Sequence, residues 1–297
     1  MKCGYVALVG EPNVGKSTLV NAMVGQKLSI VSDKPQTTRQ RVLGIYNDER
    51  AQVIFLDTPG HVAPKYRLHE RMMSFIGEAL VDADVVVFLA DATSKSPVPE
   101  DLEKRINREG RRKPVLYVLN KIDLVGGEAV EAVIKLQSGK HLYDNVLAVS
   151  ALRGKGVEDL RNQLVGFLPD QEAFYPGDII SEHPERFFAA EFVREQVFQN
   201  FRDEIPYSTA VEIREYRERE DRKTYIAADI IVERESQKGI LIGKNGAALK
   251  TLGAAARREI EEFIGRPVYL ELFVKVREKW RNKDHTLDRL GYKRQSS

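Results

Sequence analysis

The sequence predicts an α/β domain with a doubly wound, mostly parallel β-sheet, followed by a smaller α+β domain. With 297 residues, the chain is too long for one ordinary hydrophobic core. Short apolar runs alternate with helical patterns over residues 1–170, which is the pattern of βαβ units. Beyond residue 180 the order changes to helix, strand, strand, helix, helix and strand. Residues 171–180, which include Pro176 and Gly177, are expected to link a domain of residues 1–170 to a domain of residues 181–297.

The first domain is expected to contain five parallel strands that are buried on both faces. Their apolar runs are continuous rather than alternating, and they lie at residues 5–9, 51–56, 85–90, 115–119 and 146–150. Helical periodicity between these runs is clearest at residues 17–25, 69–80 and 99–108. Ligands of such sheets bind in the loops at the carboxyl ends of the strands, so these loops are expected to carry the site.

The second domain is expected to begin with an amphipathic helix near Pro184, whose apolar face carries Phe188, Val193, Val197 and Phe201. Alternating hydrophobicity predicts strands at residues 209–216 and 225–232, and a last strand at residues 268–276. A short helix is expected at residues 239–242, a long one at residues 247–264, and a basic helical tail at residues 277–290.

The composition is that of an ordinary globular protein, with 42% apolar and 30% charged residues. The net charge of +2 hides an uneven distribution. Residues 231–297 carry 15 basic and 9 acidic side chains, whereas residues 171–230 carry 8 and 14. The basic end suits an anionic partner, although a solvated helical surface has the same composition.

The sequence argues against a secreted, disulfide-stabilised or membrane-spanning protein. Cys3 is the only cysteine, so an intrachain disulfide framework is excluded and a reducing cytoplasm is expected. The first strand follows the initial Met almost at once, which leaves no room for a signal peptide. No run approaches about 18 consecutive apolar residues, so no transmembrane helix is expected.

The loop after the first strand fits the phosphate-binding pattern G-x-x-x-x-G-K-[ST], formed by Gly10, Glu11, Pro12, Asn13, Val14, Gly15, Lys16 and Ser17. Gly10 and Gly15 let backbone N–H groups wrap around phosphates at the positive end of the next helix. Lys16 is expected to neutralise the β- and γ-phosphates, and Ser17 to ligate Mg²⁺. Thr18, the next residue, is expected to belong to the same site.

Two later loops identify the base as guanine. Asn120, Lys121 and Asp123 form an Asn-Lys-x-Asp motif after the strand at residues 115–119. The carboxylate of Asp123 can accept hydrogen bonds from two nitrogen donors of guanine that adenine lacks, and discrimination of this kind reaches about 10⁴-fold. The second loop, at the end of the last strand predicted in the first domain, contains Ser150, Ala151 and Leu152. Its backbone N–H groups can donate hydrogen bonds to the guanine oxygen. These motifs predict binding of GTP and GDP, and a GTPase activity.

The turn at Asp57, Thr58, Pro59 and Gly60 directly follows the strand at residues 51–56. A carboxylate at Asp57 is suited to contact Mg²⁺ through water, and the N–H of Gly60 is suited to bind the γ-phosphate. An isolated turn of this kind carries little information. Its position between the phosphate loop and the Asn-Lys-x-Asp motif makes it part of the predicted nucleotide site.

The second domain contains a Gly-x-x-Gly turn after an apolar segment, and the motif consists of Gly239, Ile240, Leu241, Ile242, Gly243, Lys244, Asn245 and Gly246. The turn and the order of elements resemble the bacterial, type II KH fold, which clamps about four single-stranded nucleotides by their backbone. Lys244 is expected to meet a phosphate, while Ile240 and Ile242 support the bases. In the tail, Lys275, Lys279 and Trp280 can hold phosphates and stack a base. An equally good interpretation is that Trp280 caps the KH core and the cations remain solvated.

These motifs together resemble the Era family of bacterial ribosome-assembly GTPases over essentially the whole chain. The resemblance implies a P-loop GTPase domain and a KH domain, with binding to the 30S subunit near the 3′ end of 16S ribosomal RNA. It implies a role in subunit assembly and ribosomal RNA processing. The chain is expected to act as a monomer in the cytoplasm, with GTP-bound switch segments favouring RNA binding.

The resemblance also bears on catalysis. Gln36, Thr37, Thr38 and Arg39 resemble the family's first switch, in which a Thr completes Mg²⁺ coordination, and analogy favours Thr38 over Thr37. His61 follows Gly60 where the family often has an apolar residue, and it either positions water or points into solvent. Related GTPases with the same phosphate-loop pattern are thought to hold K⁺ beside the phosphates, which would give Asn13 that role.

Two alternatives from other functional classes fit the same residues. The chain could be an RNA-binding module in which GTP is only a structural ligand. It could instead be a cell-cycle signalling GTPase that contacts the inner face of the cell membrane through its basic tail. A ribosome factor with two GTPase domains is excluded because the sequence has one phosphate loop.

Overall fold

A computed structural model describes residues 1–94, 99–109, 113–218 and 223–293. The chain divides into two compact units. The first contains Met1–Ser29, Thr38–Pro64 and Met72–Glu182, and the second contains Ile30–Thr37, Lys65–Arg71 and His183–Ser297. The first unit has an α/β fold and the second an α+β fold, which confirms the predicted fold class.

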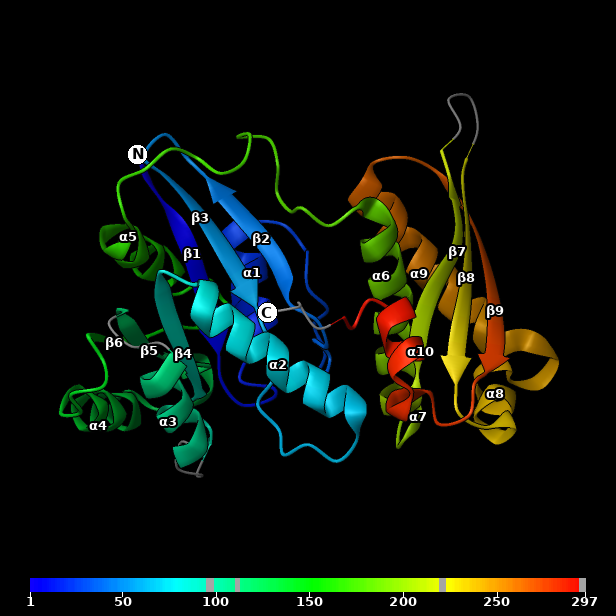
Figure 1. Cartoon of the computed structure of the whole chain (residues 1–297), viewed down its shortest axis with the longest axis horizontal. Coiled ribbons are helices and arrows are strands. Elements are labelled where there is room, and N and C mark those ends of the chain that lie inside the picture. Colours follow the sequence, from blue (N-terminus) through cyan, green and yellow to red (C-terminus); the bar gives the residue numbers. More distant parts are fainter. Residues whose placement is uncertain (95–98, 110–112, 219–222, 294–297) are drawn as a thin grey trace. The chain divides into compact units, whose positions relative to one another are not determined.

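The first unit is built on a six-stranded sheet in the order β2-β3-β1-β4-β5-β6 (Figure 1). The five predicted strands are parallel, and they are β1 (Lys2–Val9), β3 (Ala51–Asp57), β4 (Val85–Asp91), β5 (Val115–Asn120) and β6 (Asn145–Ala148). The edge strand β2 (Val42–Asn47) is antiparallel to β3 and was not predicted. Gly44 interrupts its apolar run, and glycine weakens the signal of a strand.

Helices cover both faces of this sheet, as the continuous apolar runs predicted. The described helices are α1 (Lys16–Val24), α2 (Arg67–Asp82), α3 (Glu100–Glu109), α4 (Gly127–Ser138) and α5 (Val157–Phe167), with a 3₁₀ turn η1 (Ile122–Leu124). In β3, Phe55 joins a core cluster with residues of α1 and α5, while Ile54 joins a second cluster with Ala79 of α2. Successive side chains of one strand thus supply two separate cores.

The expected linker is packed against the first unit. The backbone N–H of Ile45 in β2 donates to the carbonyl of Ile180 over 2.8 Å. The ring of Phe174 lies 5.3 Å from that of Tyr5, and the buried Gln52 side chain donates to the carbonyl of Tyr175 over 2.8 Å. This segment therefore packs against β1, β2 and β3, and the compact unit extends to residue 182.

The second unit has a three-stranded sheet in the order β7-β8-β9, in which β7 is antiparallel and β9 parallel to β8. Its elements are α6 (Glu185–Asn200), α7 (Ile205–Ser208), β7 (Ala210–Arg217), β8 (Thr224–Val232), α8 (Glu235–Ile242), η2 (Lys244–Gly246), α9 (Ala247–Ile264), β9 (Val268–Val276), η3 (Trp280–Asn282) and α10 (Asp284–Arg289). The rings of Phe188 and Phe192 on α6 lie 4.6 and 5.4 Å from that of Phe263 on α9, which joins these two helices.

Three boundaries in this unit differ from the prediction. Helix α8 begins four residues before residue 239, because Oε1 of Gln237 in its first turn accepts the backbone N–H of Arg234 over 3.1 Å and so caps the helix start, which the sequence pattern did not reveal. The short helix α7 was not predicted. The basic tail is two short helical segments rather than one helix, because Lys283 between η3 and α10 is extended, with φ −106° and ψ 107°, and Lys279 before η3 is left-handed, with φ 52°.

Among the described residues, no helix combines the length and the apolar character required to cross a membrane.

Candidate nucleotide-binding site and RNA-binding surface

The phosphate loop connects β1 to α1 and needs both of its glycines. A Cβ on Gly10 would lie 2.3 Å from the carbonyl oxygen of Leu89. A Cβ on Gly15 would lie 2.3 Å from Nδ2 of Asn120, and Gly15 has φ 96°, which other residues rarely adopt. Because α1 begins at Lys16, the loop meets the helix end that carries free N–H groups and favours anions.

Lys16 is buried, with 6% of its surface exposed, and its ammonium is held inside the loop. Its Nζ donates to the carbonyl oxygens of Gly10 and Glu11 over 3.2 and 2.8 Å. Burial lowers the pKa of Lys16 to about 8, against the attraction of the Asp57 and Glu11 carboxylates. Hydrogen bonds to two neutral carbonyls compensate only partly for the free energy lost when the ammonium is removed from water. An anion such as a phosphate would therefore stabilise this cation.

Three oxygen-bearing side chains meet beside the phosphate loop. Oγ of Ser17 lies 2.8 Å from Oγ1 of Thr38, which lies 3.4 Å from Oδ2 of Asp57. Oδ1 of Asp57 is buried without a hydrogen-bond partner within the described part of the chain. Burial raises the pKa of Asp57, against the attraction of Lys16. Hard oxygen donors around an unsatisfied carboxylate oxygen fit the ligand preference of Mg²⁺.

The base-recognition loops are tied together by the Asn120 side chain. Its Nδ2 donates to the carbonyl of Val14 over 2.8 Å, and its Oδ1 accepts the N–H of Ala151 over 2.9 Å. Ser150 Oγ donates to Oδ1 of Asp123 over 2.6 Å. Asp123 is exposed, as is Leu152, so the carboxylate is oriented yet open to a ligand.

The segment after β3 approaches the phosphate loop closely. A Cβ on Gly60 would lie 2.7 Å from Cα of Pro12, and the N–H of His61 donates to the carbonyl of Gly10 over 3.1 Å. The His61 ring does not point into solvent, because its Nε2 lies 3.0 Å from Oδ2 of Asp101 at the start of α3. Burial lowers the pKa of His61, although Asp101 favours its charged form. Asn13 lies exposed in the phosphate loop with φ 63°.

The sequence analysis missed one polar contact of the base-recognition loop. Asp91, the last residue of β4, lies beside Asn120 in the sheet register, and its Oδ2 is 2.6 Å from Nζ of Lys121. A polar residue at the carboxyl end of a strand beside the Asn-Lys-x-Asp strand is a signal that could have found it.

In the second unit, the Gly-x-x-Gly turn lies on the surface between α8 and α9. Gly243 has φ 69°, and a Cβ there would lie 2.7 Å from that of Ala248. Gly246 has φ 76°, and Asn245 is also left-handed at φ 52°. The side chains around the turn are open to solvent, namely Ile240, Lys244 and Asn245. Gly239 is exposed within α8, and Ile242 is half-buried at its end.

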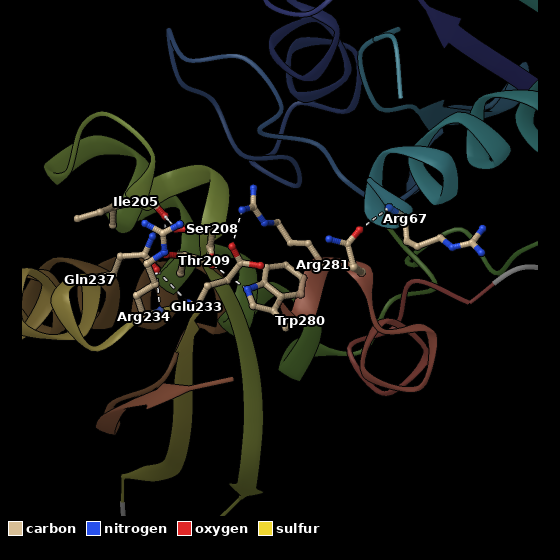
Figure 2. A network of polar contacts seen from close by, with 10 residues as sticks. Arg67, Ile205, Ser208, Thr209, Glu233, Arg234, Gln237, Trp280 and Arg281 are labelled. Atoms are coloured by element: carbon tan, nitrogen blue, oxygen red, sulfur yellow. Dashed lines mark hydrogen bonds and ion pairs between the residues drawn. The ribbon is translucent and has the colours of Figure 1, made fainter. Parts of the chain in front are cut away.

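Trp280 lies in the core of this unit. It has no exposed surface, and its indole Nε1 donates to the carbonyl of Ser208 over 2.8 Å, as Figure 2 shows. The prediction that Trp280 stacks on a base is therefore wrong, because no face of the ring is accessible. Its alternative role as a cap of the core holds. Lys275 and Lys279 are exposed, whereas Arg281 pairs with Glu233.

Two family models match the chain, and they describe the same two parts as the geometry. A 50S ribosome-binding GTPase model matches residues 5–121, and a KH domain model matches residues 204–281. GTPase Era of Thermotoga maritima is 46% identical over 298 residues, covering 99% of this chain and 98% of its own length. The chain belongs to the Era family of GTPases. GTPase Era of Geobacter metallireducens is 45% identical, with 98% of each chain covered.

Solved structures of Era have the same fold over nearly the whole chain. A variant of Aquifex aeolicus Era bound to GDP and AlF₄⁻ has a TM-score of 0.93 at 42% identity, covering 98% of this chain and 99% of its own. An Era complex with MgGDPNP and nucleotides 1506–1542 of 16S ribosomal RNA has a TM-score of 0.92 at 41% identity, with the same coverage. This Era-family chain is accordingly a GTPase with a C-terminal KH domain.

Proposed function

We propose that this Era-family GTPase is a GTP-dependent switch that binds 16S ribosomal RNA near its 3′ end and supports 30S subunit assembly and RNA processing. The observation that carries this proposal is one chain with a complete set of guanine-nucleotide loops and an exposed Gly-x-x-Gly turn. The Era complex that contains MgGDPNP and an RNA fragment supports it, because that relative is similar over 98% of this chain.

The nucleotide would lie along the loops at the carboxyl ends of β1, β3, β5 and β6. Residues 10–18 and Gly60 hold the phosphates, with Lys16 turning from its loop carbonyls towards them. Asp123 reads the base edge, Lys121 lies beside it, and the loop at residues 150–152 offers N–H groups. Burial of Lys16 and the orientation of Asp123 by Ser150 support these roles.

Mg²⁺ would neutralise phosphate charge between Ser17, Thr38 and, through water, Asp57. The 2.8 Å distance between the hydroxyl oxygens of Ser17 and Thr38 supports Thr38 over Thr37, which belongs to the second unit. The buried, unpaired Oδ1 of Asp57 supports a cation here. When bound, the ion polarises the phosphate oxygens, and the side chains orient it.

Two residues are proposed to act in hydrolysis. His61 would position the attacking water, for which its ring must leave Asp101 when the switch closes on GTP. Asn13, exposed in the phosphate loop, would hold K⁺ beside the phosphates. Exchanging KCl for NaCl at constant ionic strength tests the second role, and equal turnover in both salts would remove it.

In the KH domain, the Gly-x-x-Gly turn would clamp the RNA backbone, with Lys244 on a phosphate and Ile240 and Ile242 against the bases. Lys275 and Lys279 would add phosphate contacts, since both are exposed. We propose that the chain works as a cytoplasmic monomer. A peripheral membrane contact through its basic tail is the alternative, which liposome flotation of the full chain beside its RNA affinity separates.

The test is GTP turnover by the full chain with and without oligonucleotides that copy the 3′ end of small-subunit ribosomal RNA. A Gly243→Asp variant is measured beside it, because a charged side chain would strain the left-handed turn and repel phosphate. Stimulation that the variant loses supports the switch. Tight binding with turnover that never responds to RNA or to 30S subunits refutes it, and absent RNA binding refutes the RNA target.

A further inference from the structure

Asp91 is the last residue of β4 and lies beside the end of β5, where the base-recognition loop begins. In the register of β4 and β5, Asp91 lies opposite Asn120, the first residue of the Asn-Lys-x-Asp motif. The N–H of Ala92 donates to the carbonyl of Asn120 over 2.9 Å. The backbone thus brings the Asp91 side chain next to the residue that follows Asn120.

The two carboxylate oxygens of Asp91 have different partners. Oδ1 accepts two hydrogen bonds from Thr93, from its N–H over 2.8 Å and from its Oγ1 over 2.7 Å. Oδ2 is 2.6 Å from the ammonium of Lys121. Burial alone would raise the pKa of Asp91, but the hydrogen bonds from Lys121 and Thr93 hold it below its ordinary value. The carboxylate is therefore charged and held in one orientation.

Lys121 adopts an unfavourable backbone conformation, so a contact that fixes its side chain is of consequence. Its backbone is left-handed, with φ 64°, a conformation that costs free energy in a residue other than glycine. Its side chain is 30% exposed and that of Asp91 is 15% exposed, so solvent screens their attraction only partly. Lys121 also lies between Asn120, whose side chain donates to the carbonyl of Val14 in the phosphate loop, and the exposed Asp123, which is proposed above to bind the base.

We propose that Asp91 is a positioning residue for guanine-nucleotide binding, which acts by holding Lys121 in the orientation that receives the nucleotide. The proposal rests on the nucleotide site proposed above. Both carboxylate oxygens of Asp91 are taken up by Lys121 and Thr93, so the loss of its charge should weaken binding of the whole nucleoside without changing which base is preferred. Hydrolysis takes place at the γ-phosphate, so its rate at saturation should be preserved.

The test uses the full chain with Asp91→Asn, which keeps the shape of the side chain and removes its charge. We expect about tenfold weaker GDP binding, since a hydrogen-bonded ion pair of this kind contributes about that factor. The KM for GTP should rise by a similar factor, while kcat changes less than about twofold. The matched control is Asp82→Asn, which breaks the Arg41–Asp82 pair elsewhere in the same unit and should leave GDP affinity unchanged.

A double-mutant cycle with Lys121→Ala decides whether Asp91 acts through the lysine. If it does, Asp91→Asn has almost no further effect on GDP affinity once Lys121 is absent. An equal loss in both backgrounds, or a fall in kcat as large as the rise in KM, would overturn the proposal. So would GDP affinity in Asp91→Asn equal to that of the unmodified chain.

Inosine diphosphate, which lacks the exocyclic amino group of guanine, separates this proposal from the site it rests on. Asp91→Asn should weaken both diphosphates by the same factor, whereas Asp123→Asn should weaken GDP more than inosine diphosphate. If Asp123→Asn leaves that preference unchanged, the assigned base site is wrong. If only Asp91→Asn behaves unexpectedly, the site stands and the positioning role fails.

Discussion

At the scale of single residues, the nucleotide site depends on side chains that orient one another before any ligand binds. Asn120 bonds two loops at once, and Ser150 holds the Asp123 carboxylate. Such preorganisation lowers the entropy that binding must overcome, because fewer side-chain rotamers remain to be ordered. Because the side chains are held in place, they cannot rearrange to suit another base. A single acceptor or donor atom can therefore decide which base is bound.

A carboxylate oxygen of Asp123 is such an atom. Asp123→Asn replaces an acceptor oxygen with an N–H donor, so the guanine amino group loses its partner while xanthine, with a carbonyl there, gains one. We expect preference for GDP over xanthosine diphosphate to fall by at least about 100-fold, since unpaired polar groups in such sites are costly. Competition binding with both nucleotides measures it. An unchanged preference would contradict the assigned base edge.

Trp280 is fully buried in the second unit and is expected to stabilise its core. Trp280→Ala should lower the free energy of unfolding by about 3–5 kcal/mol, because a fully buried ring is removed. Trp280→Phe should cost less, since only part of the ring and the bond to Ser208 are lost. Urea unfolding measures both, with the exposed Lys279→Ala as control. RNA affinity of Trp280→Phe should match the unmodified chain, and a large loss there would restore a direct RNA contact.

At the scale of elements, the β2 edge shows how a segment without regular structure completes a sheet. Edge strands expose unpaired backbone groups, and proteins usually cover them. Here the carbonyl of Ile180 accepts the N–H of Ile45 at that edge, and the backbone N–H groups of Phe174 and Tyr175 bond the Gln52 side chain on the neighbouring strand β3. The segment contributes to the stability of the first unit as well as connecting it onward.

Gln52→Ala should therefore destabilise the full chain by about 2–4 kcal/mol, because it leaves partly buried backbone groups of Phe174 and Tyr175 unpaired. Hydrogen exchange at these two amides should accelerate more than exchange within β1. Glu172→Ala, an exposed change in the same segment, is the control. Rapid exchange at both amides in the unmodified protein would contradict the packed segment and favour a free linker.

At the scale of the whole molecule, the two proposed ligands are assigned to different compact units. The phosphate-loop Lys16 lies in the first unit, and Lys244 of the Gly-x-x-Gly turn lies in the second. Mutations at distant sites without shared partners usually have additive effects on free energy. Any coupling between nucleotide and RNA would appear as a departure from that additivity.

We predict that Lys16→Ala abolishes detectable GDP binding and leaves RNA affinity in the absence of nucleotide within about twofold. Lys244→Ala should weaken RNA binding and reduce the slope of log affinity against log salt by about one, as expected when one phosphate contact is lost. Its GDP affinity should not change. Fluorescence anisotropy with labelled RNA and labelled GDP measures all four values, and loss of both affinities in either variant would contradict separate sites.

The sequence by itself determined both fold classes, the positions of the parallel strands and the identity of the nucleotide, because these depend on contiguous patterns. Continuous apolar runs predicted β1, β3, β4, β5 and β6, and the bounds of α9 and β9 agree with the prediction to the residue. The glycines of the phosphate loop and the Asp of Asn-Lys-x-Asp are recognisable because backbone geometry and base chemistry leave few substitutes.

Only the tertiary structure decided features that depend on residues far apart in the chain. The ion pair of Asp91 with Lys121 spans 30 residues, and the bond from Trp280 to Ser208 spans 72. The interleaved cations around Trp280 look the same in sequence whether its ring is exposed or buried. The antiparallel β2 and the packed segment at residues 171–182 likewise gain their order from neighbouring strands. Contacts of this kind stabilise a conformation that local propensity alone leaves open.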